Sequence, residues 1–144
     1  MVNASSILER KGPKVATVAG KSTVFDAAKV MNENRIGAVV VTEGDRAVGI
    51  FTERDVLNRI VAAGRDPVKT TVDSVMTSPM ACCRRDTTLN ECRAVMSQKR
   101  IRHLPVVEGG KLYGMISAGD ILASEVTDKQ TTIEYLHEYL YGHR

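Results

Sequence analysis

Two short segments of the sequence combine a hydroxyl group and a carboxylate at the same spacing. Gly49 to Asp55 and Gly114 to Asp120 each contain a glycine, two apolar residues, a hydroxyl residue, two variable positions and an aspartate. The hydroxyl residues are Thr52 and Ser117. A carboxylate can accept both hydrogen bonds of a vicinal diol, as the acidic residue of dinucleotide-binding folds does. The pattern therefore predicts a ribose-binding site in each segment.

The same spacing also has a purely structural interpretation. Where a strand runs into a helix, Thr52 or Ser117 would cap the helix, and Asp55 or Asp120 would complete a capping box that needs no ligand. The two interpretations are compatible, because both place the hydroxyl and the carboxylate at the edge of a sheet. The neighbouring helix N-terminus would also favour a phosphate group.

Both segments belong to a longer internal repeat. A shift of 65 residues aligns positions 14–58 with 79–123 without a gap. Each copy predicts a short first strand, a helix that begins after Thr23 or Thr88, a β-hairpin and a second helix. The hairpins turn at glycine-containing segments, 43–45 and 108–110, since glycine accepts a positive φ at low cost.

One copy of the repeat has an apolar sheet face that it cannot cover alone. We therefore predict an α+β fold in which two β-α-β-β-α repeats pack sheet to sheet with pseudo-two-fold symmetry. The predicted division is an N-terminal segment (1–13), the first repeat (14–65), a linker (66–78), the second repeat (79–126) and a C-terminal helical tail (127–144).

Composition limits the function further. The chain has 144 residues and 15.7 kDa, of which 43% are hydrophobic and only 4% aromatic, with no Trp. Few aromatic residues and a dispersed net charge of +3 argue against nucleic acid as a partner. The longest apolar run, 36–41, is too short to span a membrane, and the three cysteines favour a reducing compartment. We expect a soluble cytoplasmic protein.

The repeated unit, its two Gly-h-h-Thr/Ser-x-x-Asp segments (h, apolar) and the Arg-His-Leu-Pro-Val-Val run at 102–107 resemble a stand-alone tandem cystathionine-β-synthase (CBS) domain pair. The resemblance covers about residues 14–126. It implies one Bateman-type module with two clefts for adenosine-containing ligands. AMP or ATP is the first expectation, and ADP, NAD and S-adenosylmethionine are the others. It also implies pairing of modules into a homodimer.

Carried over by position, the resemblance assigns a ribose to Thr52 and Asp55 in one cleft and to Ser117 and Asp120 in the other. The base would lie against backbone groups of two segments in each cleft. For the first cleft these residues are Val15, Ala16, Thr17, Gly37, Ala38 and Val39, and for the second they are Met80, Ala81, Cys82, Arg102, His103, Leu104 and Pro105.

The phosphate groups need cations, and the two copies of the repeat differ in them. Arg54 aligns with Gly119, and Arg102 and His103 align with a Gly-Ala pair at 37–38. We therefore expect Arg54, Arg102 and His103 to hold the phosphates, because the Arg guanidinium can bond two oxygens at once. The alternative is that Arg54 and Arg102 are solvated surface residues. His103 either titrates near neutrality or is a partly buried hydrogen-bonding residue.

Other residues favour simpler interpretations. Arg35 and Arg100 are expected at solvated helix ends. Cys92 is expected in the helix core, and the cysteine spacing is not that of a zinc site. The tail at 131–144 could cap the core, contact a second copy or bind another partner.

The sequence contains no Ser-His-Asp, paired-carboxylate or P-loop pattern, so we expect a non-catalytic sensor with no metal or catalytic cofactor. The alternative is a protein–protein regulatory module whose clefts stay empty. Either would act on a regulated enzyme whose identity the sequence does not give.

Overall fold

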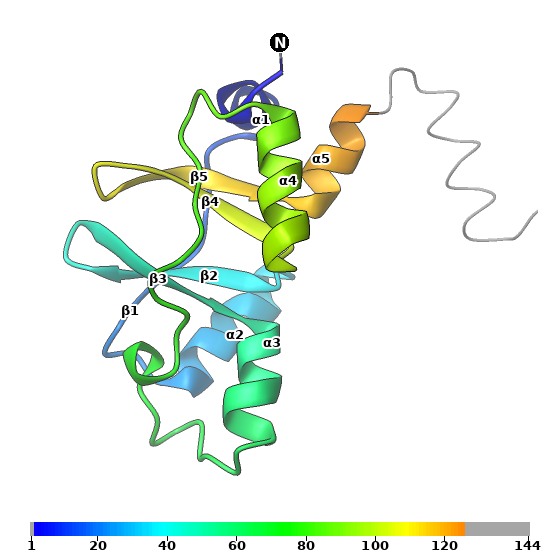
Figure 1. The fold of residues 1–144 in the computed structure, drawn as a ribbon. Helices are drawn as coiled ribbons and strands as arrows, with labels where there is room; N and C mark the ends of the chain where they lie inside the picture. The colour runs from blue at the N-terminus through cyan, green and yellow to red at the C-terminus, as the bar shows by residue number, and fades with distance from the viewer. Residues whose placement is uncertain (1, 126–144) are drawn as a thin grey trace, which may run out of the picture.

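Two β-sheets form the centre of the computed structural model, which describes residues 2–125, and helices flank them (Figure 1). In the first sheet β1 (Thr17–Ala19) runs parallel to β2 (Ala38–Glu43), and β2 pairs antiparallel with β3 (Arg46–Thr52). The second sheet is the hairpin of β4 (His103–Glu108) and β5 (Lys111–Ser117). This arrangement confirms the predicted α+β architecture.

Each hairpin is preceded and followed by a helix. Thr23 and Thr88 cap the preceding helices, as predicted, because their hydroxyl groups accept hydrogen bonds from the backbone amides three residues on. These two helices end at Arg35 and Arg100, which adopt left-handed backbone conformations (φ 53° and 55°). The helices are α2 (Val24–Asn34), α3 (Glu53–Asp55) continuing into the π-helical η1 (Val56–Val61), α4 (Leu89–Lys99) and α5 (Ala118–Glu125).

The first strand of the second repeat is shorter than the repeat pattern predicts. It consists of a single parallel bridge between Cys83 and Val106, whereas β1 makes three pairs with β2. The chain turns at residues 85–86 directly afterwards, which ends the pairing.

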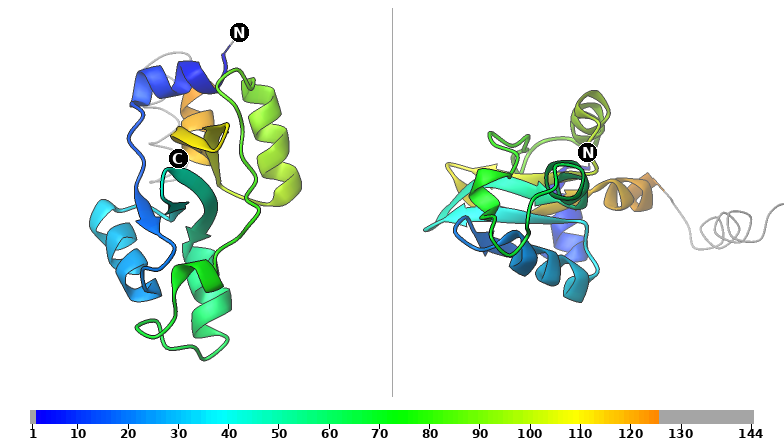
Figure 2. Two further views of the ribbon diagram at one scale, coloured as in Figure 1. Left: turned by 90° about the vertical axis from the view of Figure 1, so that its left-hand side faces the viewer. Right: turned by 90° about the horizontal axis from the view of Figure 1, so that it is seen from below.

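The segments that precede the two repeats cross over between them. Helix α1 (Ala4–Lys11) packs on the second repeat, where Ala4, Ile7 and Leu8 join its core. The linker contains the 3-10 helix η2 (Val72–Ser74) and packs on the first repeat through Val72 and Val75. Figure 2 shows the connecting segments, one after α1 and one before α4, running between the halves. Each half of the molecule is therefore completed by a segment from the other side.

A third apolar cluster joins the two sheets. Ala38, Val40 and Ile50 of the first sheet pack against Met115 of the second, and Val15 and Met80 of the crossing segments lie beside them. This cluster confirms that the repeats pack through their sheets. The predicted C-terminal tail at 127–144 lies outside the described residues. Within residues 2–125 there is no helix of the length and hydropathy needed to cross a membrane.

Candidate functional site

A pocket of about 490 Å³ opens between the two repeats. The first repeat contributes Gly37, Ile50 and residues 52–55 at the junction of β3 and α3. The second contributes residues 79–81 at its start and residues 99–103, between the end of α4 and the start of β4, and the crossing linker contributes Thr77. This volume lies in the range of small-molecule binding pockets.

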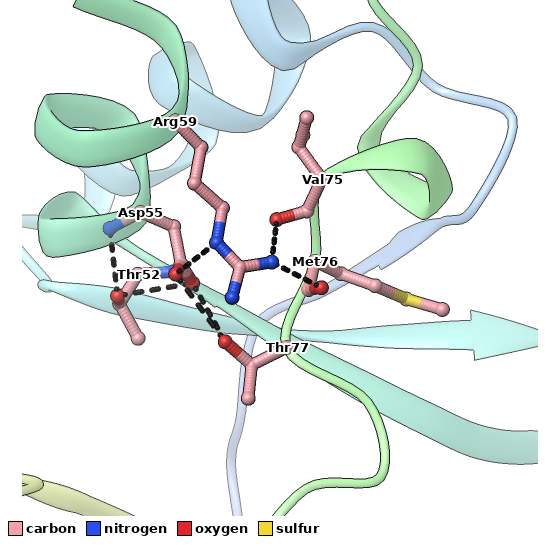
Figure 3. Close-up of polar contacts among 6 residues, drawn as sticks. All are labelled: Thr52, Asp55, Arg59, Val75, Met76 and Thr77. Atoms are coloured by element: carbon pink, nitrogen blue, oxygen red, sulfur yellow. Dashed lines mark hydrogen bonds and ion pairs between the residues drawn. The ribbon is translucent and has the colours of Figure 1, made fainter. Parts of the chain in front are cut away.

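Asp55 is the buried acidic residue of this pocket, only 8% exposed (Figure 3). Its Oδ2 atom accepts a hydrogen bond of 3.0 Å from the Thr52 backbone amide, and its own amide donates to the Thr52 hydroxyl at 3.1 Å. The predicted capping box is therefore confirmed. From the linker, the Thr77 hydroxyl donates to Asp55 Oδ1 at 3.3 Å.

Arg59 connects Asp55 to the linker. Its Nε lies 3.6 Å from Asp55 Oδ1, and its Nη1 donates to the carbonyl oxygens of Val75 and Met76, each at 2.9 Å (Figure 3). These contacts balance the charge of Asp55 and hold the linker beside the pocket. In the part of the chain that the structure describes, Oδ1 has only these two long contacts. It is the carboxylate oxygen with most capacity for a further donor.

Four cationic residues also line the pocket: Arg54, Lys99, Arg100 and Arg102. The Arg54 guanidinium donates to the Arg100 carbonyl oxygen at 2.9 Å and so connects the two repeats. Lys99 and Arg100 lie at the C-terminal end of α4, where cations are favourable beside the helix dipole. Because Arg59 already balances Asp55, Glu53 is the acidic lining residue that opposes this positive charge.

His103 also lines the pocket. Burial, and next the positive charge of Arg102, hold the pKa of His103 below its ordinary value, so the ring is neutral at pH 7. A Cβ atom at Gly37 would lie 3.0 Å from Glu53 Oε1 and 3.4 Å from His103 Cε1. The absence of a side chain at Gly37 therefore allows Glu53 and His103 to approach each other.

The second Ser-x-x-Asp segment forms the same cap but lies outside this pocket lining. The Ser117 amide donates to Asp120 Oδ2 at 2.8 Å, and the Asp120 amide donates to the Ser117 hydroxyl at 3.1 Å. Lys11 forms an ion pair with Asp120 at 2.8 Å. Burial raises the pKa of Asp120, but the hydrogen bonds from Lys11 and Ser117 outweigh it and leave this pKa below its ordinary value.

The structure groups the predicted site residues differently from the sequence analysis. Thr52 and Asp55 share a pocket with Met80, Ala81, Arg102 and His103, which we expected in the other cleft. The crossing of the linker explains this for Met80 and Ala81, which follow it directly. For Arg102 and His103, the Arg54 hydrogen bond to the Arg100 carbonyl oxygen holds the end of α4 against the first repeat. Ten predicted residues do not line the pocket: Val15, Ala16, Thr17, Ala38, Val39, Cys82, Leu104, Pro105, Ser117 and Asp120.

Several of these ten residues belong to the cores. The side chains of Val39 and Leu104 are fully buried, and Ala38 is 4% exposed. Pro105 is buried within β4, where its carbonyl oxygen accepts a hydrogen bond from the Cys83 amide. Cys82 is exposed, and Val15 packs beside the cluster between the sheets.

Seven residues line the pocket that the sequence did not predict there: Ile50, Glu53, Thr77, Pro79, Lys99, Arg100 and Ile101. Arg100 is exposed at a helix end, as expected, but it also lines the pocket. A usable signal was present, since Lys99, Arg100 and Arg102 concentrate positive charge directly before the second hairpin. Thr77 carried no comparable signal, because its role depends on how the linker crosses.

The three cysteines are free thiols. Cys92 is fully buried in the helix core, as predicted. A hydrogen bond with Cys92, together with burial, raises the pKa of Cys83, so this thiol stays protonated at physiological pH. Among residues 2–125 the structure brings together no group of three His, Cys, Asp or Glu side chains that could hold a metal ion.

Comparison with known proteins adds to this geometry. The sequence matches the CBS domain family over residues 6–62 and 72–126. It is 34% identical over 83% of its length to CBS domain-containing protein CBSX3, mitochondrial, from Arabidopsis thaliana, of which it covers 61%. It is 31% identical over 87% of its length to CBS domain-containing protein YhcV from Bacillus subtilis, of which it covers 89%. The chain thus spans nearly all of one relative and under two thirds of the other.

Solved structures with the same fold include a protein with CBS domains from Burkholderia ambifaria. It has a TM-score of 0.84 and 39% identity, and the match covers 90% of this chain and 97% of that one. A hexameric CBS-CP12 protein from bloom-forming cyanobacteria has a TM-score of 0.75 and 30% identity, with 97% and 86% of the two chains covered.

Proposed function

The chain belongs to the CBS domain family, and from that premise we propose that it is a regulatory module that binds adenosine nucleotides between its repeats. Pairs of CBS domains are generally regulatory and ligand-binding. The observation that carries the nucleotide proposal is the pocket itself, in which a buried carboxylate and a group of cations face the same space.

The Asp55 end of the pocket suits a ribose. Asp55 Oδ1 has capacity for a hydroxyl donor; the Thr77 hydroxyl lies beside it, and the Thr52 hydroxyl lies beside Oδ2. Apolar lining residues, among them Ile50, Met80 and Ile101, offer contact to the flat faces of a base.

The cationic end suits phosphate groups. Arg54, Arg100 and Arg102 present guanidinium groups that bond phosphate oxygens in pairs, and Lys99 adds a point charge. This concentration of charge favours ATP and ADP over AMP, and it favours all three over S-adenosylmethionine, which lacks phosphate. NAD carries two phosphate groups and is therefore also a candidate ligand.

We propose further that the protein acts through binding and not catalysis. The family matches identify CBS domains and show no catalytic domain. A nucleotide that contacts both repeats would favour one relative orientation of them, which is how a ligand shifts a conformational equilibrium. An enzyme that responds to this shift is the proposed partner, and a reducing compartment such as the cytoplasm is the proposed location, since all three thiols are free.

Self-association is part of the proposal. Leu57 and Leu122 occupy equivalent positions in the two repeats, and both are exposed, at 59% and 50%. A homodimer that covers both would follow the pseudo-symmetry of the chain. The similar CBS-CP12 protein is hexameric, so larger assemblies are also considered. Sedimentation velocity on wild-type protein and on Leu57→Glu distinguishes monomer, dimer and larger assemblies.

Thermal denaturation with a ligand panel tests the nucleotide proposal. The panel is AMP, ADP, ATP, NAD and S-adenosylmethionine, because a ligand at a hundred times its Kd stabilises the fold by ~2.7 kcal/mol. We expect the largest rise in Tm with ATP or ADP, and loss of that rise in Arg102→Met. Arg84→Met, which removes an exposed arginine outside the pocket, should keep it. No rise with any ligand at millimolar concentration would favour a protein–protein regulatory module with no nucleotide.

A further inference from the structure

The two aspartates of the repeated pattern are held by different groups. In the first half, Thr77 of the crossing linker forms a β-bridge with Ile50 and also contacts the aspartate, and two of these contacts have equivalents in the second half. Its backbone amide donates to the Ile50 carbonyl oxygen at 2.9 Å, and its hydroxyl donates to Asp55 at 3.3 Å. The linker therefore reaches the carboxylate with an uncharged group.

In the second half, a single ammonium group makes both equivalent contacts. Met115 is the counterpart of Ile50, and Lys11 Nζ donates to the Met115 carbonyl oxygen at 2.9 Å. The same Nζ donates to Asp120 Oδ2 at 2.8 Å. Lys11 thus occupies the position that Thr77 holds in the first half, but it brings a positive charge.

Lys11 is fixed in this position by the rest of α1. It is the last residue of the helix, whose Ile7 and Leu8 side chains are buried in the core of the second repeat. The preceding residue, Arg10, donates to the Ser124 hydroxyl on α5. The ion pair is itself partly buried, since the side chains of Lys11 and Asp120 are 31% and 21% exposed. Packing of α1 therefore holds the Lys11 backbone beside the second repeat, and its ammonium is held by its hydrogen bonds to Met115 and Asp120.

We propose that Lys11 closes the Asp120 cleft to nucleotides, so that each chain binds one nucleotide, in the Asp55 pocket. This inference rests on the proposed function and makes Lys11 the residue that selects between the two clefts. A ribose diol that bonds both carboxylate oxygens would have to displace the Lys11 ammonium from Asp120 Oδ2, where it lies at 2.8 Å. At Asp55 the nearest cation, Arg59, lies farther from the carboxylate, at 3.6 Å from Oδ1.

The phosphate end of the second cleft supports the same conclusion. Of the four cations, Arg100 has a charged equivalent, Arg35, whereas the positions equivalent to Arg54, Lys99 and Arg102 are occupied by uncharged residues. They are Gly119, Asn34 and Gly37. Closure at Asp120 and the lack of these cations both direct a phosphorylated ligand to the Asp55 pocket.

Isothermal titration with ATP tests this stoichiometry. We expect one site per chain in wild type and in Lys11→Arg, which keeps the charge. Lys11→Met should add a second, weaker site, and Asp55→Asn in the Lys11→Met background should leave only that weaker site. Lys21→Met is the matched control, because it removes the exposed Lys21–Asp73 ion pair on the other half and should leave one site.

Amide chemical shifts provide a second measurement on the same proteins. ATP should leave the amide signals of residues 117–120 unchanged in wild type and shift them in Lys11→Met. Two sites in wild type, or one site and unshifted signals in a folded Lys11→Met, would overturn the role of Lys11 and leave the proposed function intact. Absence of ATP binding to every variant and to wild type would overturn the proposed nucleotide function, and this inference with it.

Discussion

At the scale of single residues, the site depends on positions where the two repeats differ. Both aspartates accept hydrogen bonds from their capping partners, Thr52 and Ser117. Asp55 also contacts the Arg59 guanidinium and the Thr77 hydroxyl, whereas Asp120 forms an ion pair with the Lys11 ammonium. The two repeats share the capping geometry that positions each aspartate. The neighbouring residues that differ between the repeats decide which carboxylate can bind a ligand.

His103 gives a prediction about pH. Its pKa is lowered by burial and by Arg102, so the ring is neutral at pH 7; Glu53 and Asp120 oppose this, and Lys11 adds to it. A phosphate group in the pocket would stabilise the protonated ring, so binding takes up a proton. Affinity for ATP should therefore rise as the pH falls from about 7.5 to about 6, by less than tenfold per pH unit.

The pH dependence is measured by titration calorimetry over this pH range, in wild type and in His103→Gln. The nucleotide's own phosphate ionisation affects both proteins equally, so the difference between them isolates His103. Identical profiles would show that His103 does not face the phosphates.

The same histidine also affects stability. Because the folded-state pKa lies below the unfolded value, the unfolded chain binds the proton more readily, and the free energy of unfolding falls as the pH drops through the unfolded value of about 6.5. The low pKa of Asp120 acts in the same direction at lower pH, where protonation removes the stabilisation from Lys11.

At the scale of elements, local signals predicted most of the fold. Helix caps such as those of Thr23 and Thr88, and the glycine turns, involve residues only a few positions apart. Both partners of each interaction can therefore be recognised from the sequence alone. Helix α1 was not predicted, because the partners of its buried Ile7 and Leu8 lie in the second repeat, far along the chain. The η2 turn is too short to have a periodic pattern.

The substitution Gly49→Ala tests the contact between β3 and the crossing linker. A Cβ atom there would lie 2.6 Å from Met76 Sδ and 3.0 Å from the Thr77 carbonyl oxygen, so Gly49→Ala must turn the Met76 side chain aside and push the linker backbone at Thr77 outward by a few tenths of an ångström. We expect a loss of about 1 to 3 kcal/mol in the free energy of unfolding, and weaker ATP binding because Thr77 moves from Asp55.

Gly119→Ala is the matched control in urea denaturation and ATP titration. A Cβ atom there meets only Ser117 Oγ at 3.6 Å, and the residue is exposed in α5. Helix propensity favours this change by up to about 1 kcal/mol. Equal stability of the two alanine variants would contradict the described approach of the linker to Gly49.

At the scale of the whole molecule, the two crossing segments make the halves interdependent. The sequence predicted two repeats and their contact through the sheets, but it paired each aspartate with base-binding residues of its own repeat. The grouping in the pocket depends on the linker, which brings Thr77 and the following Met80 to Asp55. A repeat alignment matches equivalent positions and contains no information on which segment crosses.

Ile7 tests this interdependence. It is 1% exposed and belongs to the core of the second repeat, although it precedes the first. Ile7→Ala should lower the free energy of unfolding by about 2 to 5 kcal/mol, measured by urea denaturation. Glu9→Ala, at an exposed position of the same helix, should change it by less than about 0.5 kcal/mol. Equal effects of the two changes would show that α1 does not complete the second core.

The central claim is that the pocket between the repeats binds an adenosine nucleotide through Asp55 and the cations of the second repeat. Titration of ATP into wild type, Arg102→Met and Arg84→Met tests it most directly. We predict that loss of Arg102 weakens binding about tenfold or more, because hydrogen bonds to charged groups contribute about 1.5 to 3 kcal/mol, and that Arg84→Met binds like wild type. Equal affinity of all three proteins, or no binding by wild type, would contradict the account.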